Sequence, residues 1–246
     1  MMKFRKYIFN FILAIIIVLA NGGLWAWGGL ALLLLDAFYR FNKIRIYGKK
    51  EKLFLFLYSI IRLSLFGLII LQPSIYSKIG LIVIFISSIF WLNPYQKTNH
   101  GYLISIVAIG QFLILSTIFL AQMLWHTPLY LSLIILWSTS FIIAECLLFS
   151  LNESKNHQII AAAWALIVTE ISWILSIWQV SYILPREILI IPQPAVITTA
   201  LGYCLGGIYL AHNQNRLNRI KLIEYLIVGL LVLGVVISGT NWRGTI

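Results

Sequence analysis

Long apolar runs separated by short polar breaks make up most of this chain, and they limit what it can fold into. The chain is 61% hydrophobic and only 10% charged, and its mean hydropathy is +0.95. A soluble domain of this composition would leave far more apolar surface in water than a folded protein tolerates. A helix needs ~20 apolar residues to cross the hydrocarbon core of a bilayer. The sequence therefore predicts an all-α fold, a polytopic bundle of transmembrane helices.

Turn-forming residues divide the apolar sequence into nine runs, with glycine, proline, asparagine or charged residues at the breaks. Five or six runs have the length of a spanning helix, and the remaining ones are short. We therefore expect seven to nine helices in a single integral membrane domain over residues 1–246, with no soluble domain. The runs are Ile8–Ala20, Leu24–Tyr39, Leu53–Gln72, Ile79–Leu92, Tyr102–Leu124, Leu129–Leu151, Gln158–Leu184, Ala195–Ala211 and Leu222–Ser238.

The first two runs predict an N-terminal helical hairpin over residues 8–39, followed by a helix bundle over 53–238. Asn21-Gly22-Gly23 separates the two runs, and these residue types favour a tight turn. A basic start at Lys3–Lys6 followed by an apolar stretch is also typical of a cleavable signal peptide. We favour the hairpin because the second apolar run follows so closely, and the signal peptide stays an open alternative.

Basic residues predict the orientation, because cytoplasmic loops carry an excess of Lys and Arg. The segments on both sides of the hairpin are strongly basic, so we expect both to be cytoplasmic. Alternating the helices from there places fourteen of the 18 basic residues inside, three outside and Arg62 within the membrane. The pattern predicts a cytoplasmic N-terminus and an external C-terminus.

Four polar residues lie inside the predicted helices: Arg62, Gln111, Glu145 and Glu170. A charge at the centre of a bilayer costs ~2.5–3.5 kcal/mol, so such a residue usually faces a partner, a cavity or a pathway. Counting ~1.5 Å per residue from the cytoplasmic helix ends places three of them near the midplane and Glu145 nearer the inner surface. We predict one intramembrane polar cluster in which Arg62 pairs with Glu170 or Glu145. It serves either as a proton relay or polar-substrate site, or as a structural contact that fixes helix register.

Gly202 and Gly206 form a G-x-x-x-G pattern within an apolar run. This spacing puts two residues without side chains on one helix face, so that a neighbouring helix can approach closely. The pattern predicts helix packing within one chain rather than dimerisation, and the sequence leaves the oligomeric state open.

Histidine and cysteine residues do not form a recognisable metal-binding pattern. His100, His157 and His212 fall in predicted cytoplasmic loops, but no H-x-x-x-H or C-x-x-C spacing supports a site. Cys146 and Cys204 lie in separate apolar runs, and we expect both to be reduced packing residues. The sequence predicts no metal and no other cofactor.

Known catalytic and nucleotide-binding patterns are missing from the sequence. It contains no P-loop, no dinucleotide fingerprint, no G-x-S-x-G and no H-E-x-x-H. No predicted helix carries a nucleophile next to a base, so we expect no catalytic residue and no enzymatic activity. The positive charges sit between apolar runs, which predicts contact with the lipid bilayer and not with nucleic acid. Other membrane proteins are the remaining candidate partners.

Three stretches carry a resemblance: Glu170–Ser176, the last apolar run after Arg216–Lys221, and the terminal Asn241–Arg243. Together they resemble an uncharacterised family of polytopic membrane proteins, a domain of unknown function from small-genome bacteria. The resemblance covers the C-terminal half and implies no activity. Abundant Ile, Lys and Asn fit an A·T-rich bacterial genome. We therefore expect the protein in the bacterial cytoplasmic (inner) membrane.

Two function classes fit these observations. The first is a non-enzymatic membrane scaffold or envelope-assembly component, for which short loops and packed helices suffice. The second is a small transporter or proton-coupled carrier that uses Glu170, Glu145 and Arg62. Transporters often show related halves or interrupted helices, and the sequence has no convincing internal repeat, so we expect the scaffold class.

Overall fold

The computed structural model describes residues 33, 35, 49–91, 100–150, 156–177, 181–183, 189–213 and 217–239. Apart from Leu33 and Leu35, the expected N-terminal hairpin over 8–39 lies outside these residues. The described part is helical, with one short pair of strands, which confirms the all-α class. Its elements are α3 (Lys49–Leu71), α4 (Ile75–Trp91), α5 (His100–Trp125), α6 (Leu129–Ser150), α7 (His157–Ser176), β1 (Ser181–Ile183), β2 (Ile190–Pro192), α8 (Gln193–Asn213) and α9 (Arg219–Gly239).

Four of the described helices are long and apolar enough to cross a membrane. The apolar segments lie in α3, α5, α6 and α7, and shorter ones lie in α4 and α9. The expectation of seven to nine spanning helices stays a prediction. The four spanning segments are Leu53–Leu71, Ile106–Trp125, Leu129–Phe149 and His157–Ser176.

The chain forms two compact units. The described helices of the first are α3 and α4, and those of the second are α5 to α9. The expectation of a single membrane domain over 1–246 stays a prediction. The first unit comprises Met1–Lys97 and Leu184–Leu189, and the second comprises Thr98–Ile183 and Ile190–Ile246.

In the first unit, α3 packs against α4, and a three-residue connection joins them. Pro73 follows the end of α3 as the sequence predicts, because proline cannot continue the helix. The backbone N–H of Tyr76 donates to Ser74 Oγ at 3.3 Å, which is how a serine caps a helix N-terminus. The expected start of this helix at Ile79 is therefore wrong, since the Ser74 cap starts α4 about one turn earlier.

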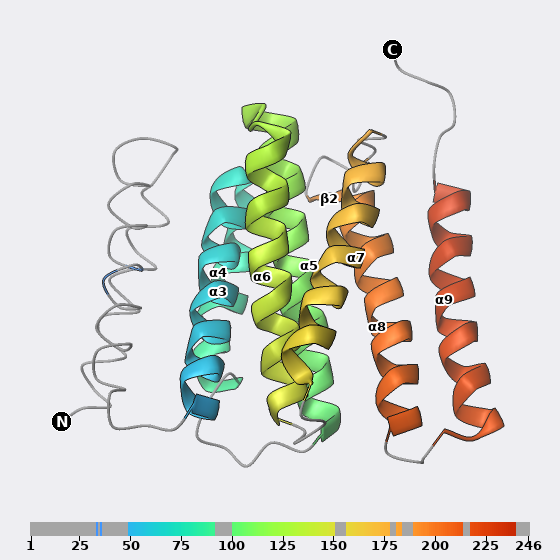
Figure 1. Cartoon of the computed structure of the whole chain (residues 1–246). Coiled ribbons are helices and arrows are strands. Elements are labelled where there is room, and N and C mark those ends of the chain that lie inside the picture. Colours follow the sequence, from blue (N-terminus) through green and yellow to red (C-terminus); the bar gives the residue numbers. More distant parts are fainter. Residues whose placement is uncertain are drawn as a thin grey trace. The chain divides into compact units, whose positions relative to one another are not determined.

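In the second unit, neighbouring helices run in alternating directions (Figure 1). Helix α6 packs mainly against α7 and α5, whereas α8 packs mainly against α5 and α9. Ala161 and Ala165 of α7 are fully buried, and Ala161 packs against Ala144 and Leu148 of α6. Small residues at this four-residue spacing let the two helix backbones approach closely.

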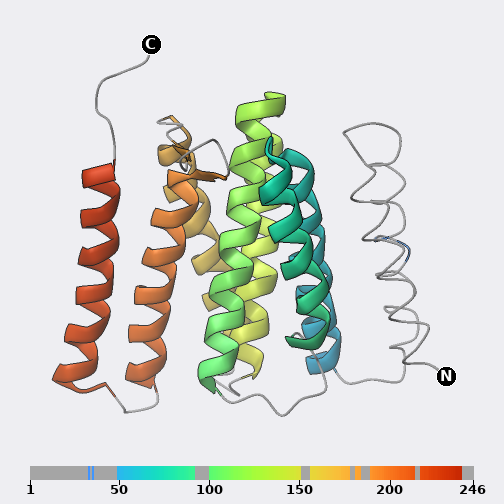
Figure 2. The same ribbon diagram turned by 180° about the vertical axis from the view of Figure 1, so that it is seen from behind.

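Helices α7 and α8 are arranged differently from the other neighbours. They lie close together where α7 ends and α8 begins, and they separate toward the opposite end (Figures 1 and 2). Each is held along its length by another partner, α7 by α6 and α8 by α5 and α9.

The expectation of one helix over Gln158–Leu184 is wrong beyond Ser176. There the chain turns into β1, which pairs antiparallel with β2 in a register that places Tyr182 opposite Ile191. Aromatic and β-branched residues such as these fit a pleated strand, and the Gln193 side chain donates a hydrogen bond to the Tyr182 hydroxyl at 3.3 Å. Apolar composition alone does not distinguish such a strand from the end of a helix.

The turn between α5 and α6 falls at the predicted break. His126 has a φ of 50°, the left-handed conformation that commonly ends a helix and that normally favours glycine. The N–H groups of Leu131 and Ser132 donate to the Pro128 carbonyl at 3.1 and 3.2 Å, which starts α6. The backbone strain of this turn therefore lies at His126.

We predict that His126→Gly stabilises the protein by ~1 kcal/mol, because a side chain in the left-handed region costs about that much and glycine avoids it. The measurement is the apparent melting temperature of the purified protein in detergent. His126→Ala is the control, since it keeps the strain while removing the imidazole. A glycine variant no more stable than the alanine variant contradicts the prediction.

Candidate functional site

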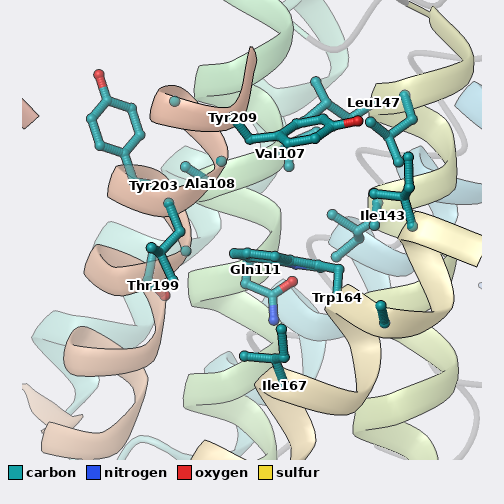
Figure 3. A pocket seen from close by; sticks show the side chains of 18 residues that line it. Val107, Ala108, Gln111, Ile143, Leu147, Trp164, Ile167, Thr199, Tyr203 and Tyr209 are labelled. Carbon is teal, nitrogen blue, oxygen red and sulfur yellow. The ribbon is translucent and has the colours of Figure 1, made fainter. Parts of the chain in front are cut away.

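A pocket of about 340 Å³ lies within the second unit, between α5, α6, α7 and α8. Figure 3 shows side chains from all four helices converging on it. It occupies the region where α7 and α8 separate, near the end of the unit at which α7 begins and α8 ends. Residues with little or no side chain, including Ala163, Gly206 and Gly207, form part of its wall. The space therefore follows from the divergence of α7 and α8, along which part of the wall has little or no side chain.

Two polar groups of the lining are buried without a hydrogen bond among the residues that the structure describes. Gln111 is 5% exposed, and its Nε2 donates to Ser140 Oγ at 3.1 Å, while its Oε1 makes no hydrogen bond. The Thr199 hydroxyl is also buried, and it makes no hydrogen bond among the described residues. A buried polar group left unsatisfied costs ~1–3 kcal/mol.

Trp164 of α7 extends across the pocket toward α8. In Figure 3 its ring has Tyr209 on one side and Gln111 and Ile167 on the other. A Cβ added at Gly202 would lie 3.3 Å from the indole Cζ2, so the absence of a side chain at Gly202 makes room for the ring.

The predicted packing pair of glycines contacts the pocket. Gly202 faces Trp164, and a Cβ on Gly206 would meet nothing within 4 Å. The close contact with α9 falls instead at Gly207, where an added Cβ would overlap the Tyr225 ring. Sequence reasoning missed Gly207, although the Gly206-Gly207 pair was a signal that two helix faces carry no side chain.

Tyr225 fixes α9 against α8. Its ring lies edge-on to the Tyr203 ring, with centroids 6.0 Å apart, and the Cys204 thiol donates to the Tyr225 carbonyl at 3.2 Å. Figure 3 shows Tyr203 pointing away from the pocket. One face of α8 is thus used for packing and another for the cavity.

Glu145 lies in α6 at 8% exposure. His157 Nε2 is 3.9 Å from Glu145 Oε1, an ion-pair distance for a protonated imidazole. The Phe149 and His157 rings also meet, with centroids 5.5 Å apart. The sequence placed His157 in a loop, but it is the first residue of α7, and this is why its contact with Glu145 was missed.

Arg62 lies in α3 and is 1% exposed. Its guanidinium carbon is 5.4 Å from the centre of the Tyr58 ring and 4.7 Å from that of Phe85 in α4. Both distances suit cation–π contacts, which strengthen when the charge is desolvated. Arg62 and the two carboxylates belong to different units, so the predicted ion pair stays a prediction.

Glu170 lies on an exposed face of α7 together with Ile167, Trp173 and Ile174. It follows His157 by thirteen residues, which at ~1.5 Å per residue separates the two by about 20 Å along the helix. The structure therefore brings Gln111 to Ser140 and Glu145 to His157, but it does not bring Glu170 to Glu145. Neither carboxylate lines the pocket.

Within the described residues, no three His, Cys, Asp or Glu side chains come together as metal ligands would. Cys146 and Cys204 are both buried, and neither forms a disulfide among the described residues. The described site is therefore a largely apolar pocket, and the uncharged polar side chains of its lining include Gln111, Trp164, Thr199 and Tyr209.

Comparisons with protein-family models, with curated proteins and with solved structures give no match. The fold and site define a class only: a helical protein in whose described part four helices are suited to a membrane and an apolar pocket lies between four helices. The resemblance to polytopic membrane proteins of small-genome bacteria rests on the sequence stretches alone.

We predict that Gly207→Ala destabilises the protein relative to Gly206→Ala. Both substitutions improve helix propensity by ~1 kcal/mol, but only the one at Gly207 places a methyl group in the Tyr225 ring, and such overpacking costs ~1–3 kcal/mol. Apparent melting temperatures in one detergent measure the difference. Equal values for the two variants would show that the contact between α8 and α9 does not depend on Gly207.

Proposed function

We propose that this chain is a non-enzymatic, polytopic protein of the bacterial cytoplasmic (inner) membrane, with its N-terminus in the cytoplasm. In this proposal it serves as a scaffold or envelope-assembly component whose partners are lipids and other membrane proteins. The proposal extends the coarser finding that four of the described helices are suited to cross a membrane.

The lining of the pocket is the observation that carries the proposal. No Asp, Glu, Lys, Arg or His is among the described residues that form it. A carrier coupled to protons places ionisable groups along its substrate path, and this pocket offers none. An uncharged pocket favours a protein that does not move ions through this unit.

Polar contacts between helices support the same proposal. Glu145 lies beside His157 of the next helix, and Gln111 donates to Ser140. Contacts of this kind are worth ~0.6–2 kcal/mol each in a membrane and hold neighbouring helices in one register. A scaffold needs such fixed helices, because its function is to present a constant surface.

A small transporter or proton-coupled carrier that uses Glu170, Glu145 and Arg62 is the second candidate. One observation favours it: the Glu170 side chain is exposed within a helix suited to cross a membrane. A carboxylate is disfavoured against lipid and usually marks a partner or a pathway. Measurement of flux separates the two candidates.

We expect vesicles that contain the wild-type protein to behave like empty vesicles. The assay imposes a pH gradient and follows internal pH with a trapped dye while amino acids or sugars are added outside. Glu170→Gln should give the same traces and accumulate normally, because glutamine keeps the hydrogen-bonding capacity of glutamate without its charge.

Glu145→Gln is the companion variant, since it makes the same change at the other carboxylate that the carrier would use, beside His157. A wild-type flux above that of empty vesicles, lost in Glu170→Gln, would replace the scaffold with the carrier. A flux lost in both variants would also support the carrier and assign both carboxylates to it.

We also expect Asn156 and Tyr130 to lie on opposite sides of the membrane, Asn156 inside. Both are exposed, near the start of α7 and of α6 respectively. The measurement is labelling of Asn156→Cys and Tyr130→Cys in intact cells with a membrane-impermeant maleimide, in a background with Cys146 and Cys204 replaced by alanine. Labelling of Tyr130→Cys alone is expected, and labelling of both would overturn the topology.

A further inference from the structure

One side of α7 is exposed along the second half of the helix. Its exposed residues recur every three or four positions, so they form a single stripe on the helix surface. The buried residues of α7, among them Ala165 and Ser172, lie on the opposite side and face α6. The exposed stripe consists of Leu166, Ile167, Glu170, Trp173, Ile174 and Ile177.

Glu170 lies at the centre of this stripe. At ~100° of rotation per residue the stripe covers an arc of about 120°, with Trp173 at one edge and Ile167 at the other. Glu170 falls about midway between these two edges. The other side chains of the stripe are aliphatic or aromatic, which suits lipid, whereas a carboxylate is disfavoured in hydrocarbon. The stripe therefore has a polar group where contact with lipid tolerates it least.

The position of Glu170 along α7 keeps its carboxylate away from the membrane surface. Ser176, the last residue of the spanning segment, follows Glu170 by six residues, which is about 9 Å along the helix axis. The Cα–Cβ bond of a helical residue is tilted toward the helix N-terminus, so the side chain starts toward the longer part of the span. Lys and Arg reach the interface on long stems, and glutamate has no such stem. A partner for Glu170 is therefore expected within the membrane.

The described residues do not supply this partner. Glu170 makes no hydrogen bond or ion pair with any of them, and it does not line the pocket between α5 and α8. Of the four spanning segments, that of α7 is the least buried, because α7 packs mainly against α6 alone. The face that carries Glu170 is therefore available to a further helix.

The chemistry of the stripe favours a cation on that helix. An opposite charge that hydrogen-bonds to the carboxylate is what offsets its desolvation. Trp173 lies one turn from Glu170, and residues three apart are neighbours on a helix surface. Its side chain is 53% exposed, and the indole is the ring that best attracts a cation. A second copy of this chain, packed on the same face, would instead oppose two like charges.

We propose that this stripe of α7 is the docking face for a transmembrane helix of another protein, one that carries a Lys or Arg within its span. The basic side chain pairs with Glu170 and lies against Trp173, while Leu166 and Ile174 pack against the apolar residues of the same helix. The proposal rests on the scaffold function and states the chemistry of the partner that the scaffold holds.

The test uses the full-length protein in phosphatidylcholine vesicles together with synthetic transmembrane peptides. Each peptide is a polyleucine helix of ~20 residues, with Lys, Leu or Glu at the depth of Glu170. Energy transfer between labelled protein and labelled peptide measures their association. We expect the Lys peptide to associate about three- to thirtyfold more tightly than the all-leucine peptide, the effect of one polar contact between membrane helices.

Charge reversal provides the decisive variant. Glu170→Leu should abolish the preference for the Lys peptide, and Glu170→Lys should transfer the preference to the Glu peptide. Glu224→Leu is the matched control, because Glu224 is an exposed glutamate of α9 in the same unit. It should leave the preference unchanged. Circular dichroism of each variant establishes that a loss of association is not a loss of folding.

The outcomes separate this proposal from the function on which it rests. A Lys peptide that binds no better than the all-leucine peptide, or equally well to wild type and Glu170→Leu, overturns the docking face. Association between labelled copies of the protein that is lost in Glu170→Leu replaces the basic partner with a second copy. Flux in the vesicle assay above tests the scaffold itself, so a negative peptide result without flux overturns the docking face alone.

Discussion

The contact between α6 and α7 is the interaction on which the described part of the second unit depends. Ala161 and Ala165 are both fully buried, and they allow α7 to lie directly against α6, with Ala161 on Ala144 and Leu148. This approach places His157 beside Glu145. Helix α7 packs mainly against α6, whereas α8 packs mainly against α5 and α9. Because of this, α7 and α8 can separate from each other. The pocket is a consequence of that division of contacts.

Much of the helical fold follows from the lengths of the apolar runs and the residues at their ends. The expected run Leu129–Leu151 corresponds to α6, Leu129–Ser150, because Pro128 and the left-handed His126 make the preceding break unambiguous. The end of α7 was not predictable in this way. Residues after Ser176 remain apolar, and their preference for strand is decided by pairing with a segment farther along the chain, which local composition does not contain.

The candidate site was predictable only in part. Gln111 was identified because an amide within an apolar run has to find a partner. Thr199 was not, because Ser and Thr in helices commonly bond to their own backbone, as Thr169 does with the Ala165 carbonyl at 2.7 Å. Whether a hydroxyl is satisfied locally or faces a cavity depends on rotamer and packing. These are properties of the assembled helices and not of any one of them.

Trp164 extends into the pocket, with Tyr209 on one side of its ring and Gln111 on the other (Figure 3). The ring fits there because Gly202 has no side chain to displace it. Because the indole occupies part of the space between α7 and α8, its position decides how much of that space is left empty. The free volume of the pocket is therefore a property of one side chain, and it depends on Gly202, a residue with no side chain of its own.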